Sequence, residues 1–208
     1  MQVHSQTMSN AADDIIGLYD RNAAHYDKDR LRILFEKIWL DRFLVLLPAG
    51  GAILDIGCGM AEPIARYFID AGFSLTGVDA APAMIGLCQS RFPDHDWRVA
   101  DMRMLALGRG FDGLIAWDSF FHLTHDAQRA MFPIFRAHAA PNAALMFTSG
   151  PSHGEATGSY HGEPLYHASL DAAEYAGLLD RNGFDIVAHV ANDPDCDRHT
   201  VWLARARP

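Results

Sequence analysis

The sequence predicts an α/β fold, in which a mostly parallel sheet is covered by helices on both faces. Between residues 52 and 148, short apolar runs alternate with helical segments, a pattern typical of parallel strands joined by crossover helices. The first apolar run turns through Gly57 and Gly59 into a helix, as strand-to-helix turns in such sheets do. The last two apolar runs lie too close in sequence for a crossover helix, so we expect them to pair antiparallel.

Two helices are expected before this alternation, in an N-terminal helical cap of residues 1–47. The first is predicted at residues 9–28, with Ser9 or Asn10 as its N-cap. The second is predicted at residues 29–47, where apolar side chains recur at three- and four-residue spacing.

The central part of the chain, residues 48–149, is expected to form the core of the sheet. Buried strands are predicted at residues 52–56, 73–78, 97–100, 111–117 and 143–148, and helices at residues 63–71, 82–91 and 126–139. Glycine and proline mark many of the boundaries between these elements.

The remaining residues divide into a loop and a closing unit. Residues 150–170 are rich in glycine, proline and histidine and predict a long loop that acts as a lid or shapes an acceptor pocket. Residues 171–208 predict a helix at 171–181 and the two antiparallel strands, at 184–190 and 200–204. We therefore expect one domain across residues 1–208.

Composition excludes several classes of protein. Half of the 208 residues are hydrophobic and the formal net charge is −9, which disfavours long nucleic acids as partners. Three widely spaced cysteines fit neither a disulfide framework nor a zinc site, and no apolar run is long enough to span a membrane. The eleven histidines show no tight ligand motif, so no metal is expected. A cytoplasmic protein, monomeric or homodimeric, follows.

The stretch that points to chemistry is residues 53–62, Ile-Leu-Asp-Ile-Gly-Cys-Gly-Met-Ala-Glu. Its glycines allow a tight turn close to a ligand, and the following helix start favours an anionic group. Glu62 stands where a dinucleotide-binding turn needs its third glycine, and it would face a pyrophosphate badly. Asp55, two residues before Gly57, instead offers a carboxylate to a ligand that carries a cation, as S-adenosylmethionine does.

Acidic residues follow the next two strands. Asp79 closes the second strand, 24 residues after Asp55, where a carboxylate can accept hydrogen bonds from ribose hydroxyls. Asp101 and Met102 follow the third strand, where an acid can bind an adenine amino group and a thioether can pack on the ring. The fourth strand runs into Trp117-Asp-Ser-Phe-Phe-His122, whose place at a carboxyl end puts it beside the glycine turn.

Together these motifs resemble the ordered motifs of class I S-adenosylmethionine-dependent methyltransferases of the small-molecule type, most strongly over residues 51–149. Residues 19–27 also resemble the helical cap of small-molecule members, in which the second tyrosine, here Tyr26, lies over the cofactor. The resemblance implies a Rossmann-like, seven-stranded sheet with one antiparallel strand. It departs from the family where Ala61 replaces a third glycine and where residues 140–143 replace a Lys-Pro-Gly-Gly turn.

The resemblance implies a site for S-adenosyl-L-methionine and for a small-molecule acceptor. The expected cofactor-binding residues are Tyr26, Asp55, Gly57, Cys58, Gly59, Asp79, Ala80, Met84, Asp101, Met102, Trp117 and Asp118. The expected substrate pocket contains Tyr19, Phe121, His153, Tyr160 and Tyr166. A base is needed only if the acceptor loses a proton, and the candidates are His122, His161 and His167, with His153 and Glu155 as further choices.

Other interpretations stay open at this point. Asp79 and Asp101 could cap helices, Cys58 and the methionines could be ordinary core residues, and the loop histidines could be solvated. The chain could also be a nicotinamide-dependent oxidoreductase, since Asp79 suits either ribose, or a protein that binds S-adenosylmethionine without catalysis. The expected function is methyl transfer, in line and at a sulfonium carbon, for which the protein supplies proximity, orientation and a dry site.

Overall fold

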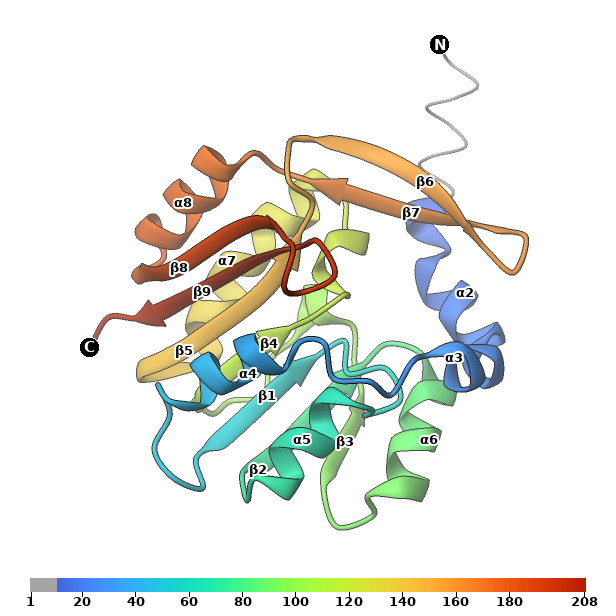
Figure 1. The fold of residues 1–208 in the computed structure, drawn as a ribbon, viewed down its shortest axis with the longest axis horizontal. Coiled ribbons are helices and arrows are strands. Elements are labelled where there is room, and N and C mark those ends of the chain that lie inside the picture. The colour runs from blue at the N-terminus through green and yellow to red at the C-terminus, as the bar shows by residue number, and fades with distance from the viewer. Residues whose placement is uncertain (1–10) are drawn as a thin grey trace.

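A computed structural model describes residues 11–208, and its centre is a seven-stranded sheet of order β3-β2-β1-β4-β5-β9-β8 (Figure 1). The strands are β1 (Ala52–Ile56), β2 (Ser74–Asp79), β3 (Asp96–Val99), β4 (Phe111–Ala116), β5 (Ala139–Ser149), β8 (Phe184–Asp193) and β9 (His199–Ala206). Strand β9 lies between β5 and β8 and runs antiparallel to both. The predicted fold class is confirmed, and the sheet order reverses between β1 and β4, the place where such sheets bind ligands.

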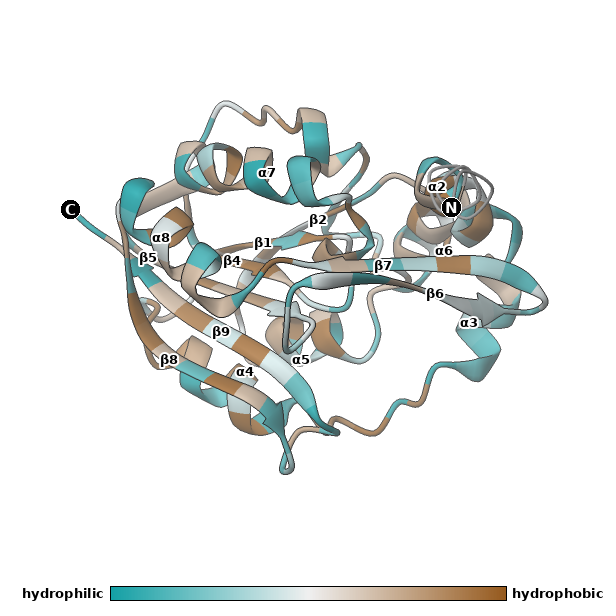
Figure 2. Cartoon of the chain, turned by 90° about the horizontal axis from the view of Figure 1, so that it is seen from above, coloured by the Kyte–Doolittle hydropathy of each residue, from teal (hydrophilic) through white to brown (hydrophobic). Residues whose placement is uncertain are grey.

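The sheet carries one hydrophobic core on each face because neighbouring strand residues point to opposite sides. On one face, Leu54 and Leu145 pack with aromatic residues of α7 (His125–His138) and α8 (Ala172–Arg181). On the other, Ile53 and Met146 pack with α4 (Lys37–Leu44), α5 (Ile64–Asp70) and α6 (Pro82–Arg91). Figure 2 shows these two helical layers on either side of the sheet.

The N-terminal cap differs from its prediction. The expected caps Ser9 and Asn10 lie outside the described residues. In place of one helix to residue 28, the chain forms α2 (Ile15–Arg21) and α3 (Ala23–Asp29), which meet at Asn22. The second predicted helix begins only at Lys37, because residues 30–36 are drawn across the glycine turn by arginine side chains described below.

The segment predicted as a long loop is a β-hairpin. It consists of β6 (Gly154–Tyr160) and β7 (Glu163–Ser169), a separate two-stranded sheet that lies beside α2 in Figure 1. Strand β7 also contacts η2 (Phe120–His122). A second short helix, η1 (Met102–Met104), follows β3. The glycine, histidine and proline content of this segment is typical of a loop, so the two strands were not predicted. In the structure the strands pair antiparallel, with Thr157 opposite Tyr166.

Candidate functional site

The glycine turn after β1 is held by backbone hydrogen bonds and by close packing. The N–H groups of Gly57 and Cys58 both donate to the carbonyl of Val78, at 2.8 and 3.0 Å. Gly57 has φ of 77°, and a Cβ there would lie 2.3 Å from Cβ of Ser119. Only glycine therefore fits position 57, both for its backbone angle and for the space beside it.

Asp79 joins the end of β2 to this turn. One carboxylate oxygen, Oδ2, accepts from the N–H of Gly59, and Oδ1 accepts from the N–H of Ala81, both at 2.9 Å. Burial raises the pKa of Asp79, while these backbone hydrogen bonds act to lower it. Ala81 is the N-cap of α6 and no side chain caps that helix, so Asp79 is not its capping residue; its carboxylate lines a pocket.

The first pocket opens over the carboxyl ends of β2, β3 and β4. The space inside, including its open mouth, is about 730 Å³, within the range of small-molecule sites. Its lining includes Tyr19, Tyr26, Gly57, Gly59, Asp79, Ala80, Met84, Asp101, Met102, Asp118 and His122. Asp101 also accepts from the backbone N–H and the guanidinium of Arg103, so it caps η1 as well as facing the pocket.

The second pocket adjoins the first on the other side of the glycine turn. Its lining includes Tyr26, Arg30, Asp55, Gly57, Cys58, Gly59, Trp117 and Asp118. Every residue that the sequence assigned to cofactor binding therefore lines one of the two pockets.

An acidic residue, Asp55, and a basic residue, Arg30, both line the second pocket. Burial and the nearby Asp79 carboxylate raise the pKa of Asp55 to about 7, so an ammonium group bound there would restore its ionised form. Arg30 is half-buried and donates to the buried carboxylate of Glu36 at 2.6 Å. Nε1 of Trp117 is buried without a hydrogen-bond partner among the described residues. The pocket thus offers an anion for a cation, and two donors for a carboxylate.

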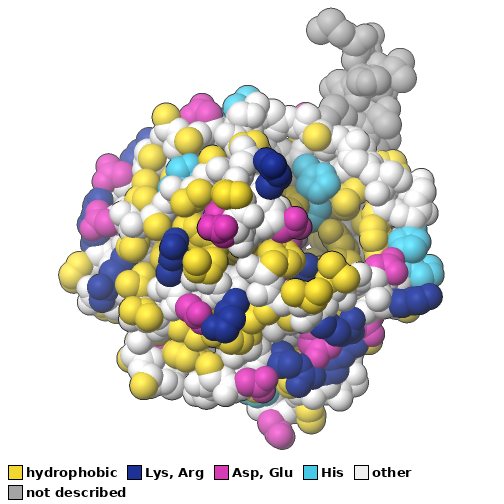
Figure 3. Space-filling model, viewed as in Figure 1, with side chains coloured by type: hydrophobic (Ala, Val, Ile, Leu, Met, Phe, Trp, Pro, Cys, Tyr) yellow, Lys and Arg dark blue, Asp and Glu magenta, His cyan; other side chains and the backbone are white. Residues whose placement is uncertain are grey.

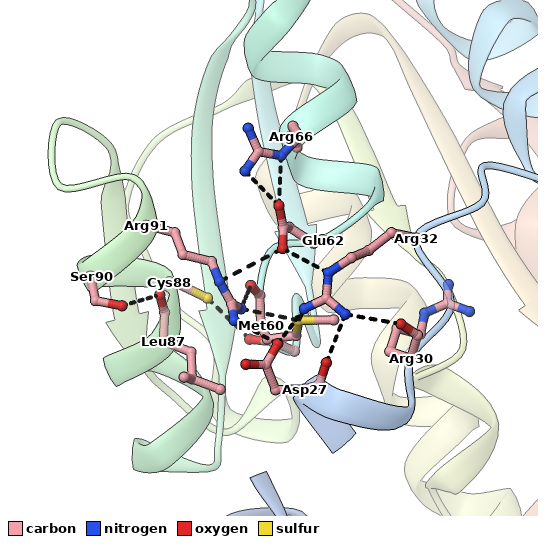
Figure 4. Close-up of polar contacts among 11 residues, drawn as sticks. Asp27, Arg30, Arg32, Met60, Glu62, Arg66, Leu87, Cys88, Ser90 and Arg91 are labelled. Carbon is pink, nitrogen blue, oxygen red and sulfur yellow. Dashed lines mark hydrogen bonds and ion pairs between the residues drawn. The ribbon is translucent and has the colours of Figure 1, made fainter. Parts of the chain in front are cut away.

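A network of ion pairs fixes the segment that carries Arg30 over the glycine turn (Figure 4). Arg32 donates to Asp27 at 2.5 Å and to Glu62 at 3.2 Å, and Glu62 also pairs with Arg66. Arg91, on α6, bonds the backbone carbonyl of Met60 at 3.0 Å and pairs with Asp27. Glu62, which argued against a dinucleotide, therefore has a structural role in tying the cap to the turn.

His122, a predicted base, is buried and uses both ring nitrogens. Nδ1 lies 2.8 Å from the backbone carbonyl of Tyr166, and Nε2 lies 2.8 Å from the hydroxyl of Tyr19. Burial lowers the pKa of His122 to about 4, so the ring is neutral at pH 7. A carbonyl only accepts, so Nδ1 carries the proton and Nε2 accepts from the hydroxyl of Tyr19.

Asp118 lies where the two pockets meet and is held by a histidine from the far end of the chain. Its N–H donates to the Thr148 hydroxyl at 2.9 Å, and Oδ1 accepts from Nε2 of His199 at 2.9 Å. The His199 ring stacks on Trp117, with 5.4 Å between centroids. Although burial opposes it, the hydrogen bond and charge of Asp118 raise the pKa of His199.

The remaining predicted residues divide into two groups. Phe121, His153 and His167 line a third, shallower pocket beyond β5, and His167 lies 4.8 Å from His122 between ring centroids. His161 and Tyr166 line none of the three pockets: His161 bonds Asp29 at 2.8 Å in the hairpin turn, and the hydroxyl of Tyr166 donates to Glu155. The base role of His161 stays a prediction; in the structure its ring lies against Asp29, the last residue of α3, and outside the three pockets.

Tyr160, the last predicted pocket residue, also lines none of the three, although its hydroxyl is buried without a hydrogen-bond partner among the described residues.

Sequence reasoning missed Arg30 and His199. Arg30 falls in the helix predicted at residues 29–47, and nothing in the sequence distinguishes it from its neighbours Lys28 and Arg32. His199 begins the last strand, 81 residues after Asp118, and only the insertion of β9 beside β5 brings the two together. No sequence motif carries either contact.

Within residues 11–208, no group of three or more His, Cys, Asp and Glu side chains could hold a metal ion. No helix in the same range is both long and apolar enough to cross a membrane.

Sequence comparison identifies the central region. A family model described as "Methyltransferase domain" matches residues 53–142, from the first strand of the sheet to the turn within β5. The matched range contains the glycine turn, Asp79, Asp101 and the segment from Trp117 to His122. No curated protein matches the chain in sequence.

Solved structures match nearly the whole chain. CalS10, an amino pentose methyltransferase from Micromonospora echinaspora solved with S-adenosylmethionine, has a TM-score of 0.70 at 19% identity, covering 89% of this chain and 95% of that one. The 1,6-didemethyltoxoflavin-N1-methyltransferase of Burkholderia thailandensis scores 0.68 at 20% identity, with 95% and 87% covered. An S-adenosylmethionine-dependent methyltransferase from Clostridium acetobutylicum scores 0.72 at 13% identity, with 92% and 100% covered. The fold is therefore shared over about nine-tenths of this chain.

Proposed function

We propose that this chain, a class I S-adenosylmethionine-dependent methyltransferase by its methyltransferase domain and its fold, methylates a small-molecule acceptor. The observation that carries the proposal is the pair of pockets on either side of one glycine turn. The first pocket offers Asp79, Asp101 and Met102, and the second offers Asp55 and Arg30. This arrangement suits a ligand with a nucleoside at one end and an amino acid at the other.

In this proposal the first pocket binds the nucleoside part of the cofactor and the second pocket binds its amino-acid part. Asp79 would accept from the ribose hydroxyls, and Asp101 and Met102 would bind the adenine. Asp55 would bind the ammonium group, while Arg30 and Nε1 of Trp117 would bind the carboxylate. A dinucleotide has no such ammonium group, so these residues favour methyl transfer over a nicotinamide-dependent reaction.

S-adenosylmethionine supplies an activated methyl group when it is bound, so the protein mainly positions the acceptor and excludes water. The N-terminal cap and the hairpin perform the second task in this proposal. They meet through contacts between α2 and β7, and Glu163 of the hairpin accepts from Arg21 and Asn22 of the cap. The segment of residues 150–170 thus acts as a lid over the acceptor side.

Surface charge supports a small acceptor. On the face shown in Figure 3, Lys and Arg side chains are interspersed with Asp and Glu, and the chain has a net charge of −9. We expect no nucleic-acid partner, since such partners require a basic surface. A cytoplasmic location is supported by three cysteines that are free thiols, and the oligomeric state, monomer or homodimer, stays a prediction.

Calorimetry on the purified protein tests the proposal. We expect saturable binding of S-adenosylmethionine and S-adenosylhomocysteine, no binding of NAD⁺, and label transfer from methyl-labelled cofactor to an acceptor pool of small molecules. Saturable NAD⁺ binding without binding of the sulfur nucleosides would overturn it. Cofactor binding without transfer to any acceptor would leave a non-catalytic binding protein, and would remove the enzymatic part of the proposal.

Arg30→Gln locates the amino-acid end of the ligand. We expect it to weaken S-adenosylhomocysteine binding at least tenfold, because a charged hydrogen bond to the carboxylate is lost. It should leave methylthioadenosine, which lacks the amino acid, bound as in the wild type. Arg98→Gln, a change at an exposed ion pair with Asp96, is the matched control and should alter neither affinity.

A further inference from the structure

One wall of the first pocket, formed by Tyr19, Asp118 and Ser119, offers hydrogen-bond acceptors, because the hydroxyl protons of Tyr19 and Ser119 and the N–H of Asp118 already have partners. His122 donates from Nδ1 to the Tyr166 carbonyl and accepts the Tyr19 proton at Nε2, so the Tyr19 oxygen keeps only lone pairs for a ligand. Ser119, between them in the lining, donates its own proton to the carbonyl of Ile56 at 2.7 Å.

Asp118 is held in place by the residue behind it. His199 has an acceptor at each ring nitrogen, the Cys196 carbonyl 3.0 Å from Nδ1 and Asp118 Oδ1 2.9 Å from Nε2. A ring with acceptors on both sides is satisfied only as the imidazolium, which carries two N–H groups. The ring is also packed between Trp117 and Phe35, with centroids 5.4 and 5.2 Å away. Asp118 therefore presents a charged, oriented oxygen to the junction of the two pockets.

The chemistry of this wall selects among acceptors. A molecule bound there must donate hydrogen bonds, which leaves amines and hydroxyls. A carboxylate beside the tyrosine rings of Tyr19 and Tyr26, which meet edge to face at 5.7 Å, attracts a cation more than a neutral group. An ionised phenol would be repelled by the same carboxylate.

The hydrogen bonds of His122 also favour an amine over a hydroxyl as the acceptor. Methylation of a hydroxyl needs a base to remove its proton, and His122 is already committed to Tyr19 and to the Tyr166 carbonyl. A neutral amine needs no base during attack, because its own lone pair is the nucleophile.

Resting on the proposed function, we propose that the acceptor is an amine whose reacting nitrogen donates N–H groups to Asp118 and Tyr19. The ammonium form first releases one proton to solvent. The freed lone pair then forms the N–C bond as the S–C bond breaks, with its electrons going to sulfur. Ammonium and sulfonium thus give a methylammonium, a neutral thioether and one proton.

Matched probes test the assignment on protein saturated with S-adenosylhomocysteine. We expect benzylamine, as its ammonium ion, to bind at least tenfold more tightly than benzyl alcohol in calorimetry. With methyl-labelled cofactor, label should transfer to amines of a panel and not to alcohols of the same skeletons. Transfer to the alcohols, or equal responses of amine and alcohol, including none from either, would overturn the inference.

Variants show whether Asp118 is responsible. Asp118→Asn keeps the shape of the side chain and suits its φ of 49°, so the protein should fold, while amine affinity falls at least tenfold. Asp94→Asn, at an exposed carboxylate away from the site, should retain the amine preference. Unchanged amine binding in Asp118→Asn would refute the role of Asp118. Failure of the wild type to bind S-adenosylhomocysteine would instead refute the proposed function, which separates the two results.

In this proposal His199 is a positioning residue that orients Asp118. Two substitutions of His199, one that keeps an N–H donor and one that removes it, test this role. His199→Gln retains an N–H donor for Asp118, so we expect the ratio of amine to alcohol affinity to stay within threefold of wild type. His199→Phe keeps an aromatic ring against Trp117 but loses the donor, and should lower that ratio at least fivefold. An equal fall in both variants would indicate a purely structural ring.

Discussion

The cofactor side and the lid side of the site are built in different ways. The cofactor side is fixed by backbone groups, since Gly57, Cys58 and Gly59 all donate to the end of β2. The lid side is held by side chains from separate elements: Arg21 and Asn22 contact Glu163, His161 contacts Asp29, and the buried His122 ring contacts the Tyr166 carbonyl. Exposed ion pairs contribute about 0–1 kcal/mol each. The cofactor side therefore depends on backbone groups within the sheet, whereas the lid depends on side-chain contacts between elements.

The largest effect is expected from a substitution in the glycine turn on the cofactor side. Gly57→Ala places a Cβ 2.3 Å from Ser119 at a φ of 77°, so we expect loss of S-adenosylhomocysteine binding and a destabilisation of about 3 kcal/mol. Calorimetry and chemical unfolding measure the two effects. Gly72→Ala has a similar φ of 84° but no atom within 4 Å of the added Cβ, so it isolates backbone strain at about 1 kcal/mol. Equal costs for the two variants would contradict the packing argument.

The next largest effect is the pH dependence of folding stability due to His122, which lines the first pocket and contacts the lid. Because burial lowers the pKa of His122 to about 4, from an unfolded value near 6.5, the unfolded chain binds more protons between these values. The stability due to neutral His122 is therefore complete above pH 6.5 and is lost as pH falls towards 4, by up to about 3 kcal/mol.

The raised pKa of Asp55 has the opposite slope, so a variant must isolate the histidine. His122→Asn, measured by urea unfolding at several pH values, should lose less stability than the wild type between pH 7 and pH 4.5. Parallel curves for the two proteins would show that the ring is not buried in its neutral form.

Asp79→Asn sharpens the comparison by removing one anchor of the glycine turn. The amide can accept at only one atom and would turn a donor towards the N–H of Gly59 or Ala81. We expect S-adenosylhomocysteine affinity to fall at least tenfold, about 1.4 kcal/mol. Asp96→Asn, at the exposed start of β3, should leave the affinity unchanged. Wild-type affinity in Asp79→Asn would argue against ribose binding at this position.

The smallest effect concerns the lid. Glu163→Gln removes the charge that joins the hairpin to Arg21, and we expect a stability change below about 1 kcal/mol. Hydrogen exchange at residues 159–163 should nevertheless become faster, since the hairpin detaches more often. Glu174→Gln, which breaks a comparable pair with Arg129 between α7 and α8, should leave exchange in the hairpin unchanged. Unaltered exchange in Glu163→Gln would show that other contacts hold the lid.

Prediction from sequence succeeded better on the cofactor side than on the lid side. Strand positions, the helix at residues 82–91 and the antiparallel tail were predicted well, because short apolar runs and glycine or proline breaks are local signals. The helix expected at residues 29–47 was wrong over its first turns. Arg30 and Arg32 leave the helical path to reach Glu36 and Glu62, contacts that helical periodicity does not encode. The hairpin was missed because β6 is polar and contains two glycines, and because neither strand is a continuous apolar run.

The sequence by itself determined the fold class, through the alternation of apolar runs and helical segments. It also determined the glycine turn and the acidic residues Asp55, Asp79 and Asp101, since each lies within a few residues of the carboxyl end of a strand. Only the tertiary structure decided which groups face an acceptor. Tyr19, His122 and Tyr166 come from three separate elements, and His199 reaches Asp118 only through the placement of β9. Hydrogen-bond direction at such a site depends on partners that are distant in sequence, and no local pattern can specify it.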